Sequence, residues 1–286
     1  MRFKDFWFSY KNILYREIEK KKYLSFIRRV FGILFKFLIR YLRHKFQNKV
    51  LNLDKKKNQK DYFNLSFEKL FLNFNSDKGP FWYDGDKKFV AHSYYIYYEK
   101  YFRELKEKKV NILEIGSHEG KGIASFFFFF PFSNIIGANI NPFQMKFSSV
   151  RIKELYIDVA SKKILQNFAE HLNDEQDIII DDASHNLRDI LITLPIMFKK
   201  LKNGGIYVIE DMDQFEIFKE LNLYKNEMTP KEILKKIKNK EYFRSSFIDE
   251  NDRLYLQENI SEIKMEVGTM IIDGKNASDI AFIFKK

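Results

Sequence analysis

The stretch VNILEIGSHEGKGIASFFFFFP, residues 110–131, decides the fold class of this chain. Its first seven residues are a mostly apolar run that ends in glycine, which is typical of a buried strand. Residues 120–130 favour a helix, and the helix is expected to stop near Pro131. Gly116 allows the backbone to turn sharply between the two elements. The stretch therefore predicts a strand, a turn and a helix in succession.

The same alternation continues on both sides of this stretch. Further strands are predicted within residues 134–140, 150–158, 176–182 and 204–211, and helices within 94–108, 161–172 and 187–202. Strands that alternate with helices predict an α/β fold with a doubly wound, mostly parallel sheet. The two final apolar runs, 262–274 and 278–286, predict an antiparallel hairpin at the end of the sheet.

Residues 1–60 differ from the rest of the chain in charge. They hold 18 Lys and Arg against 4 Asp and Glu, whereas the whole chain has a net charge of +11. We predict a basic amphipathic helical segment over 1–60, with a polar linker over 53–62, and a main domain over 61–286. The apolar run 30–42 contains Lys36 and Arg40 and is too short to span a bilayer.

Two interpretations of the basic segment stay open. A basic amphipathic helix can lie on an anionic membrane surface through residues 1–50, or it can pack on the main domain or on a partner. No signal peptide is recognisable, so we expect a cytoplasmic protein, either free or peripheral at the inner face of the membrane. No nucleic-acid-binding motif accompanies the charge, so nucleic acid is not an expected partner.

The composition also limits the chemistry. The chain has no cysteine, which excludes a disulfide scaffold, a thiolate zinc site and a cysteine nucleophile. Its 31 Phe and 16 Tyr residues can fill a sizeable core. We expect the five consecutive phenylalanines at 126–130 to belong to that core and not to a binding site.

Polar side chains stand where the predicted strands end. Because ligands of such sheets bind beyond the carboxyl ends of the strands, these side chains are candidates for one shared site. They are Glu114, Asn139, Asp158, Asp181, Asp182, Glu210 and Asp211.

Two acidic pairs, at 181–182 and 210–211, end two of these strands. Carboxylates so close together repel one another unless they are protonated or bind a cation. Oxygen ligands suit Mg²⁺ or Mn²⁺ better than zinc. The alternative is that the acids cap the helices that follow. Two pairs at neighbouring strand ends favour the metal.

Several motifs resemble known enzymes. LEIGSHEGKG, 113–122, resembles the first motif of class I S-adenosylmethionine-dependent methyltransferases, which have a Rossmann-like fold. SDKG at 76–79, HSYYIYYEKYF at 92–102, DDASH at 181–185 and GGIYVIED at 204–211 resemble the macrocin and mycinamicin type of sugar O-methyltransferases. The similarity covers roughly residues 70–212, and a related branch is the cephalosporin hydroxylase-like group.

This resemblance implies that S-adenosylmethionine is the methyl donor. Glu114, Gly116 and Ser117 would lie near its methionine end, and Asp158 near its adenine. Asn139 stands where the family usually has an acidic residue for the ribose hydroxyls. An amide can still bond a diol, but it is neutral and has one acceptor oxygen.

The resemblance also implies Asp182, Glu210 and Asp211 as ligands of Mg²⁺ or Mn²⁺, with Asp181 supporting them. The expected reaction is O-methylation of a sugar or glycoconjugate hydroxyl on a small-molecule or glycan acceptor. Asp182 and His185 are the predicted catalytic residues. A divalent ion lowers the pKa of a hydroxyl. A neutral imidazole three residues beyond Asp182 can then accept the proton.

Two other functions remain as alternatives. One is a catalytically degenerate methyltransferase fold that serves as a scaffold at a membrane surface. The other is a hydroxylase-type oxidoreductase, but a non-haem iron site needs two histidines and one carboxylate, and only His185 is near the acids. Residues 222–258 are expected to form a lid or substrate cover. A homo-oligomer is left open.

Overall fold

A seven-stranded sheet forms the centre of the computed structural model, which describes residues 3–20, 30–32, 34, 35, 38, 39, 42, 50–56, 59–141, 143–212 and 214–286. The strand order is β10-β13-β9-β8-β4-β5-β7. The parallel strands are β4 (Asn111–Ile115), β5 (Asn134–Asn139), β7 (Ile152–Tyr156), β8 (Gln176–Asp181) and β9 (Leu201–Ile209).

The last two long strands, β10 (Ile260–Val267) and β13 (Asp279–Lys285), pair antiparallel to one another. Strand β13 also pairs antiparallel with β9, so it lies between β10 and the parallel strands. The short strands β11 (Ile271–Ile272) and β12 (Lys275–Asn276) form the turn of this hairpin. The predicted fold class, including the C-terminal antiparallel hairpin, is confirmed.

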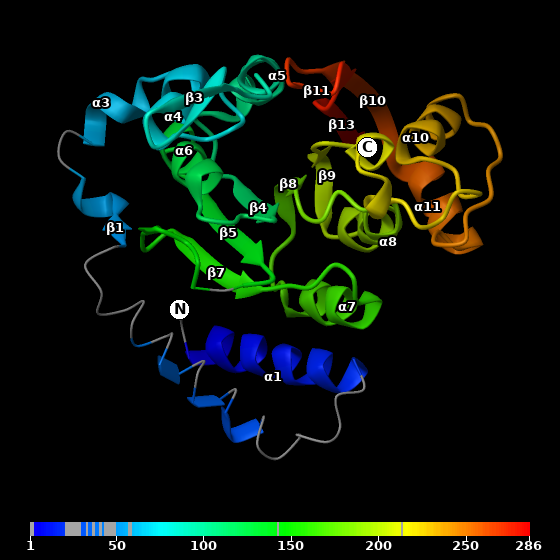
Figure 1. The fold of residues 1–286 in the computed structure, drawn as a ribbon, viewed down its shortest axis with the longest axis horizontal. Helices are drawn as coiled ribbons and strands as arrows, with labels where there is room; N and C mark the ends of the chain where they lie inside the picture. The colour runs from blue at the N-terminus through cyan, green and yellow to red at the C-terminus, as the bar shows by residue number, and fades with distance from the viewer. Residues whose placement is uncertain are drawn as a thin grey trace.

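Helices cover both faces of the sheet (Figure 1). One face carries α7 (Lys162–His171) and α8 (Leu187–Phe198), and the other carries α4 (Phe67–Phe74), α5 (Tyr95–Phe102) and α6 (Lys121–Phe129). All five phenylalanines at 126–130 are fully buried, and the ring of Phe129 stacks on Phe67 with centroids 3.7 Å apart. The prediction that this run belongs to the core is confirmed.

Strand β9 begins three residues earlier than the sequence predicts. Helix α8 ends at Phe198, and the amide of Gln176 donates to the carbonyl of Lys200 at 2.9 Å. Leu201 already pairs with Gln176 on β8. The apolar pattern of α8 therefore continues beyond its last residue into β9, because a buried apolar side chain fits a helix and a strand equally well.

The segment 214–259 continues the core on the α8 side. It contains α9 (Gln214–Ile217), α10 (Pro230–Lys238) and α11 (Glu250–Asn259). Ile233, Leu234 and Leu256 are fully buried in the cluster that includes α8. The helices of the segment expected to be a lid are thus packed elements of the domain.

The N-terminal helix α1 (Phe3–Glu19) lies along β7, the edge strand of the sheet, and beside α7 (Figure 1). Further along, β1 (Leu51–Asn52) pairs with β6 (Phe147–Ser148), and Leu53 is fully buried. The predicted linker 53–62 was wrong in this respect, since it starts with a core residue and includes most of the helix α3 (Gln59–Phe63). The division at residue 60 itself stays a prediction.

Most of residues 21–49, on which the predicted membrane contact largely depends, lie outside the described residues. Among the helices that are described, none has the length and apolar character needed to cross a membrane. Two further strands, β2 (Phe81–Asp84) and β3 (Lys87–Val90), form a separate hairpin beside α4.

Candidate cofactor and metal site

The carboxyl ends of β4, β8 and β9 lie side by side. Ile115 at the end of β4 pairs with Asp181 on β8, and Asp181 pairs with Ile209 on β9. The side chains at and just beyond these strand ends therefore lie along one edge of the sheet. This register places Glu114, Asp182 and Glu210 around a common point.

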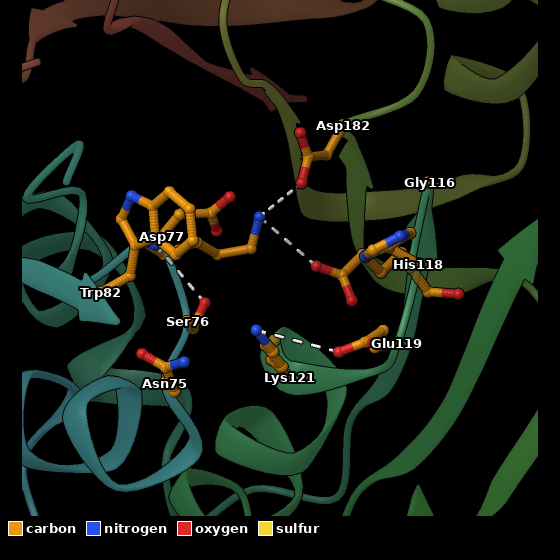
Figure 2. Close-up of a pocket in the computed structure, with 13 residues that line it drawn as sticks. Asn75, Ser76, Asp77, Trp82, Gly116, His118, Glu119, Lys121 and Asp182 are labelled. Carbon is orange, nitrogen blue, oxygen red and sulfur yellow. Dashed lines mark hydrogen bonds and ion pairs between the residues drawn. The ribbon is translucent and has the colours of Figure 1, made fainter. Parts of the chain in front are cut away.

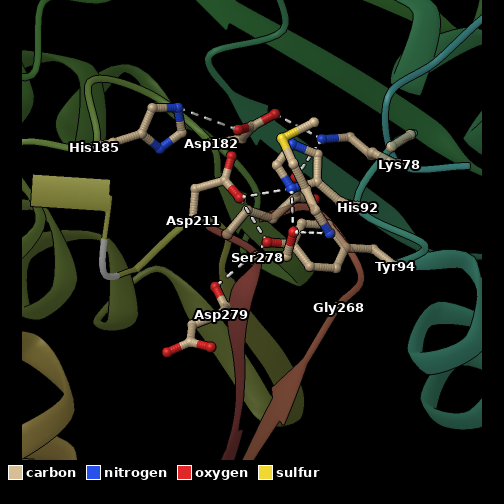
Figure 3. A network of polar contacts seen from close by, with 12 residues as sticks. Lys78, His92, Tyr94, Asp182, His185, Asp211, Gly268, Ser278 and Asp279 are labelled. Carbon is tan, nitrogen blue, oxygen red and sulfur yellow. Dashed lines mark hydrogen bonds and ion pairs between the residues drawn. The ribbon is translucent and has the colours of Figure 1, made fainter. Parts of the chain in front are cut away.

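A lysine that the strand pattern did not predict occupies that point. The side chain of Lys78 is 3% exposed, and its ammonium lies 2.6 Å from Oδ2 of Asp182 (Figure 3), 2.5 Å from Oε2 of Glu210 and 3.5 Å from Oε1 of Glu114. Burial alone would lower the pKa of Lys78, but the surrounding carboxylates raise it well above its ordinary value. Lys78 is therefore the internal counter-ion of the acidic edge.

Backbone hydrogen bonds and a nearby glycine hold Lys78 in this position. The amide of Tyr95 donates to the carbonyl of Lys78 at 3.0 Å, and the amide of Ser76 donates to that of Phe71 at 2.8 Å. A Cβ at position 122 would lie 2.5 Å from Oε1 of Glu114 and 3.0 Å from Cε of Lys78, so glycine leaves room for the pair. The available sequence signal was the SDKG motif at 76–79.

A second group combines Asp182, His185 and Asp211. One ligand atom from each lies within 4.8 Å of the others, and Nε2 of His185 is 3.7 Å from Oδ1 of Asp182 (Figure 3). His185 and Asp211 both have φ of 51°, in the left-handed region that non-glycine residues rarely adopt. Such strain persists only where surrounding contacts enforce it, and it is common at functional sites.

Contacts from the far side hold Asp211 in this group. Tyr94 donates to Oδ1 of Asp211 at 2.6 Å, and Nδ1 of His92 lies 3.2 Å from the same oxygen (Figure 3). The hydroxyl of Ser278, the residue just before β13, is 2.9 Å from Nδ1 of His92. His92 and Tyr94 lie within the HSYYIYYEKYF motif at 92–102, which was the available sequence signal, whereas Ser278 lies in none of the motifs.

The predicted metal ligands thus fall into two environments. Asp182 and Asp211 belong to the group with His185. Glu210 is turned toward Lys78 and also accepts a short hydrogen bond from Tyr98. The carboxylates of Asp182 and Asp211 are oxygen donors of the kind that Mg²⁺ or Mn²⁺ prefers, so the residues present fit a divalent ion, with the imidazole of His185 beside them. The role of each ligand stays a prediction.

Asp181 faces the other way. Its Oδ2 accepts a hydrogen bond from Tyr207 at 3.2 Å inside the core. Burial raises the pKa of Asp181 to about 7, while the bond from Tyr207 opposes the shift. These contacts suit the supporting role that was expected of Asp181.

Two cavities meet at Gly116. The first, of about 220 Å³, is lined among others by Lys78, Trp82, Glu114, Ser117 and Lys121 (Figure 2). The second, of about 210 Å³, is lined by Asn139, Ile140, Ile157, Asp158 and Ala183 among others. Gly116 lines both and has φ of 93°, and a Cβ there would lie 1.8 Å from the carbonyl oxygen of Asp182. Only glycine fits at this junction.

The first cavity contains buried polar atoms that lack a partner among the described residues. They are Oε2 of Glu114 and Oγ of Ser117, which are 2% and 5% exposed as residues. Burial raises the pKa of Glu114 to about 7, and Lys78 opposes the shift. Because unpaired buried polar groups are costly, these atoms suit a polar ligand with a cationic group.

The second cavity holds the remaining predicted cofactor residues. The amide of Asn139 reaches the carbonyl of His118 at 3.5 Å. Oδ1 of Asp158 accepts from the amide of Ala160 at 3.1 Å, and Oδ2 accepts from Nε of Arg16 at 2.5 Å. The five predicted cofactor residues therefore line two adjoining cavities, one with a mixed polar and apolar wall and one with a largely apolar wall.

Known proteins with similar sequences are enzymes of one kind. L-olivosyl-oleandolide 3-O-methyltransferase of Streptomyces antibioticus is 28% identical over 156 residues, which cover 50% of this chain and 36% of the relative. Mycinamicin VI 2''-O-methyltransferase of Micromonospora griseorubida is 30% identical over 128 residues, covering 42% and 32%. This chain resembles the sugar O-methyltransferases. It spans about a third of the length of these curated relatives.

The fold of the chain is that of a class I methyltransferase. MycE methyltransferase of the mycinamycin biosynthetic pathway, solved with Mg, SAH and mycinamycin VI, superposes with a TM-score of 0.57 at 22% identity. The superposition covers 77% of this chain and 54% of MycE. No protein-family model matches the chain.

Proposed function

We propose that this chain is an S-adenosylmethionine-dependent O-methyltransferase, aided by Mg²⁺ or Mn²⁺, that acts on a hydroxyl of a sugar or glycoconjugate. The observation that carries the proposal is the junction at Gly116. Two cavities suited to the two halves of the methyl donor meet there, and Asp182 of the Asp182–His185–Asp211 group lines the first of them. The named relatives, and a solved neighbour that contains Mg and SAH, support the same conclusion.

The donor's two ends would bind differently. In the first cavity, Oε2 of Glu114 and Oγ of Ser117, which have no hydrogen-bond partner among the described residues, can bond the α-ammonium group. In the second cavity, Asn139 and Asp158 offer an amide and a carboxylate to the ribose and the adenine. When bound, the donor supplies a methyl group that is already activated by its positive sulfur.

The chain's own task is to prepare the acceptor. A new oxygen–carbon bond forms as the sulfur–methyl bond breaks, and the electron pair of that bond stays on sulfur. The hydroxyl proton goes to the imidazole of His185, which lies beside Asp182 and Asp211. Asp182 and Asp211, together with the predicted Glu210, would hold the ion, which supplies positive charge to acidify the hydroxyl.

Calorimetric titration tests this function. S-adenosylmethionine should bind the wild-type chain, and Mg²⁺ should bind separately. Asp182→Ala should abolish Mg²⁺ binding, whereas Asp174→Asn, at an exposed acid on the loop before β8, should change neither affinity. Binding of both ligands would justify a screen of sugar acceptors for release of S-adenosylhomocysteine. Absence of donor binding under all conditions would contradict the proposal and favour the scaffold alternative.

The hydroxylase-type alternative gains no support from the geometry. The candidate ligand group among the described residues contains a single histidine, His185. His92 approaches Asp211 but is engaged with Ser278.

Peripheral contact with an anionic membrane is the second part of the proposal. Phe31, Phe35, Leu38 and Leu42 recur at helical spacing in the basic segment and are between 41% and 70% exposed. Apolar side chains at this spacing among lysines and arginines suit the surface of a bilayer. Such contact would place the enzyme in the cytoplasm at the inner face of the membrane, near a lipid-linked or surface glycan.

Vesicle sedimentation of the full chain tests the contact. Vesicles with anionic lipid should retain the chain and neutral vesicles should not. Phe35→Ser should weaken retention, whereas Phe132→Ser, which removes an exposed phenylalanine from a distant loop, should not. If both variants are retained equally, the apolar side chains of the segment do not contact the vesicle surface.

A further inference from the structure

One face of helix α1 is matched to the edge of the sheet. Phe8, Asn12 and Arg16 recur every four residues and Ser9 lies three before Asn12, so these contact residues project from one side of the helix. The ring of Phe8 stacks on His171 with centroids 3.9 Å apart. The amide of Tyr156 on β7 donates to Oγ of Ser9 at 3.2 Å.

These contacts fix where α1 lies along the length of β7. Oδ1 of Asn12 accepts from Asn167 on α7 at 3.0 Å, one turn beyond Ser9. An edge strand exposes unpaired backbone groups, and Ser9 satisfies one of them. Because polar contacts are directional, the helix cannot slide without losing them, so its last turn is held near the carboxyl end of β7.

Arg16 in that last turn contacts a cofactor residue. Its Nε donates to Oδ2 of Asp158 at 2.5 Å, and its Nη1 donates to Oε2 of Glu19 at 2.6 Å. The side chain of Asp158 is 4% exposed and that of Arg16 is 17% exposed. Asp158 lines the second cavity, whereas Arg16 is not among the lining residues. The guanidinium therefore holds the carboxylate from outside the cavity.

The carboxylate is held on both sides. Oδ1 of Asp158 accepts from the amide of Ala160, and Oδ2 accepts from Arg16. Each carboxylate oxygen can accept more than one hydrogen bond, so both can still receive a donor from the cavity. A charge-assisted bond to a guanidinium also offsets the cost of burying the negative charge.

We propose that α1 is part of the cofactor site and that Arg16 is a positioning residue, which orients Asp158 toward the amino group of the donor's purine. This inference rests on the proposed function. It gives the N-terminal segment a role in the site, 142 residues away in sequence from the carboxylate that it supports. An ionised, fixed acceptor would select a 6-amino purine over a 6-oxo purine, because the latter presents an acceptor there.

Titration of S-adenosylhomocysteine and of its 6-oxo analogue S-inosylhomocysteine tests the proposal on the full chain. Arg16→Met should weaken binding of the adenine compound by about tenfold and reduce its advantage over the inosine compound. Asp158→Asn should have a similar effect. The double variant should be no weaker than Asp158→Asn alone, since Arg16 acts through Asp158. Lys11→Met, at an exposed position of the same helix, is the matched control and should bind as the wild type does.

The outcomes separate this inference from the proposed function. No binding of S-adenosylhomocysteine to the wild type would overturn both. Normal binding and unchanged purine preference in Arg16→Met would overturn the inference alone, as would additive losses in the double variant. If Arg16→Met does not fold, Arg16→Lys decides the question. Lysine keeps the positive charge but lacks the planar set of guanidinium donors. The preference for the adenine compound over the inosine compound should therefore lie between those of the wild type and Asp158→Asn, and a preference equal to that of the wild type would contradict the proposal.

Discussion

The ammonium of Lys78 lies 2.6 Å from Asp182, between the two acidic pairs that end β8 and β9. It also contacts Glu210 from the second pair and Glu114 from the first cavity. One cation therefore connects the wall of the cofactor cavity with two predicted metal ligands. The acids at this edge are compatible with folding because the chain supplies part of the positive charge itself.

Removing that charge should destabilise the fold. Lys78→Met leaves the buried carboxylates of Glu114 and Glu210 and the partly exposed one of Asp182 without their counter-ion, and we expect a loss of about 3 to 5 kcal/mol in the free energy of unfolding at pH 8. Urea denaturation measures it, with Lys87→Met on the exposed β3 strand as control. The loss should shrink at pH 5, because protonated carboxyls no longer need the cation. A loss of equal size at both pH values would mean that packing, and not charge, is responsible.

The junction at Gly116 should not tolerate a side chain. In Gly116→Ala the new Cβ would meet the backbone of Asp182 at 1.8 Å, in addition to the strain of a φ of 93°. Gly204 also has a positive φ, of 74°, but nothing lies within 4 Å of a Cβ there. Gly204→Ala thus reports strain alone, about 1 kcal/mol.

Thermal denaturation compares the two alanine variants. We expect Gly116→Ala to lower the melting temperature much more than Gly204→Ala and to abolish donor binding. Similar melting temperatures for both would show that the loop after β4 can move away from Asp182.

Donor binding should tighten as the pH rises through neutrality. The pKa of Glu114 is raised to about 7 by burial, so its carboxyl is largely protonated at pH 6 and ionised at pH 8. The ammonium group of the donor favours the ionised form. Affinity for S-adenosylhomocysteine should therefore increase by up to about tenfold between pH 6 and 8. Calorimetry at both pH values checks this, and Glu114→Gln should bind weakly and without the pH dependence. The same dependence in Glu114→Gln would assign it to another group.

His185 should matter for transfer and not for donor binding. Once an acceptor is found, His185→Gln should reduce methyl transfer by about 100-fold or more while S-adenosylhomocysteine binds as before. Release of S-adenosylhomocysteine per minute measures the transfer, and calorimetry measures the binding. Transfer that persists in the variant with an unchanged pH profile would exclude His185 as the base.

Local sequence patterns predict most of the elements and the edge of the sheet where the site lies. Strand and helix periods are local properties, so β4, α6, β5, β8 and β9 could be read from runs of a few residues. The positions of Glu114, Asp182 and Asp211 at strand ends followed from the same runs, because parallel strands direct their carboxyl ends to one edge.

Which charges meet at that edge depends on how distant parts of the chain pack together. Lys78 precedes its partners Asp182 and Glu210 by 104 and 132 residues, and Arg16 precedes Asp158 by 142. No local period connects residues so far apart; their contacts depend on the strand order and on how α1 and the loop before β2 pack against the sheet. Burial sets the apolar period of each element, whereas the pairing of buried charges depends on which elements become neighbours.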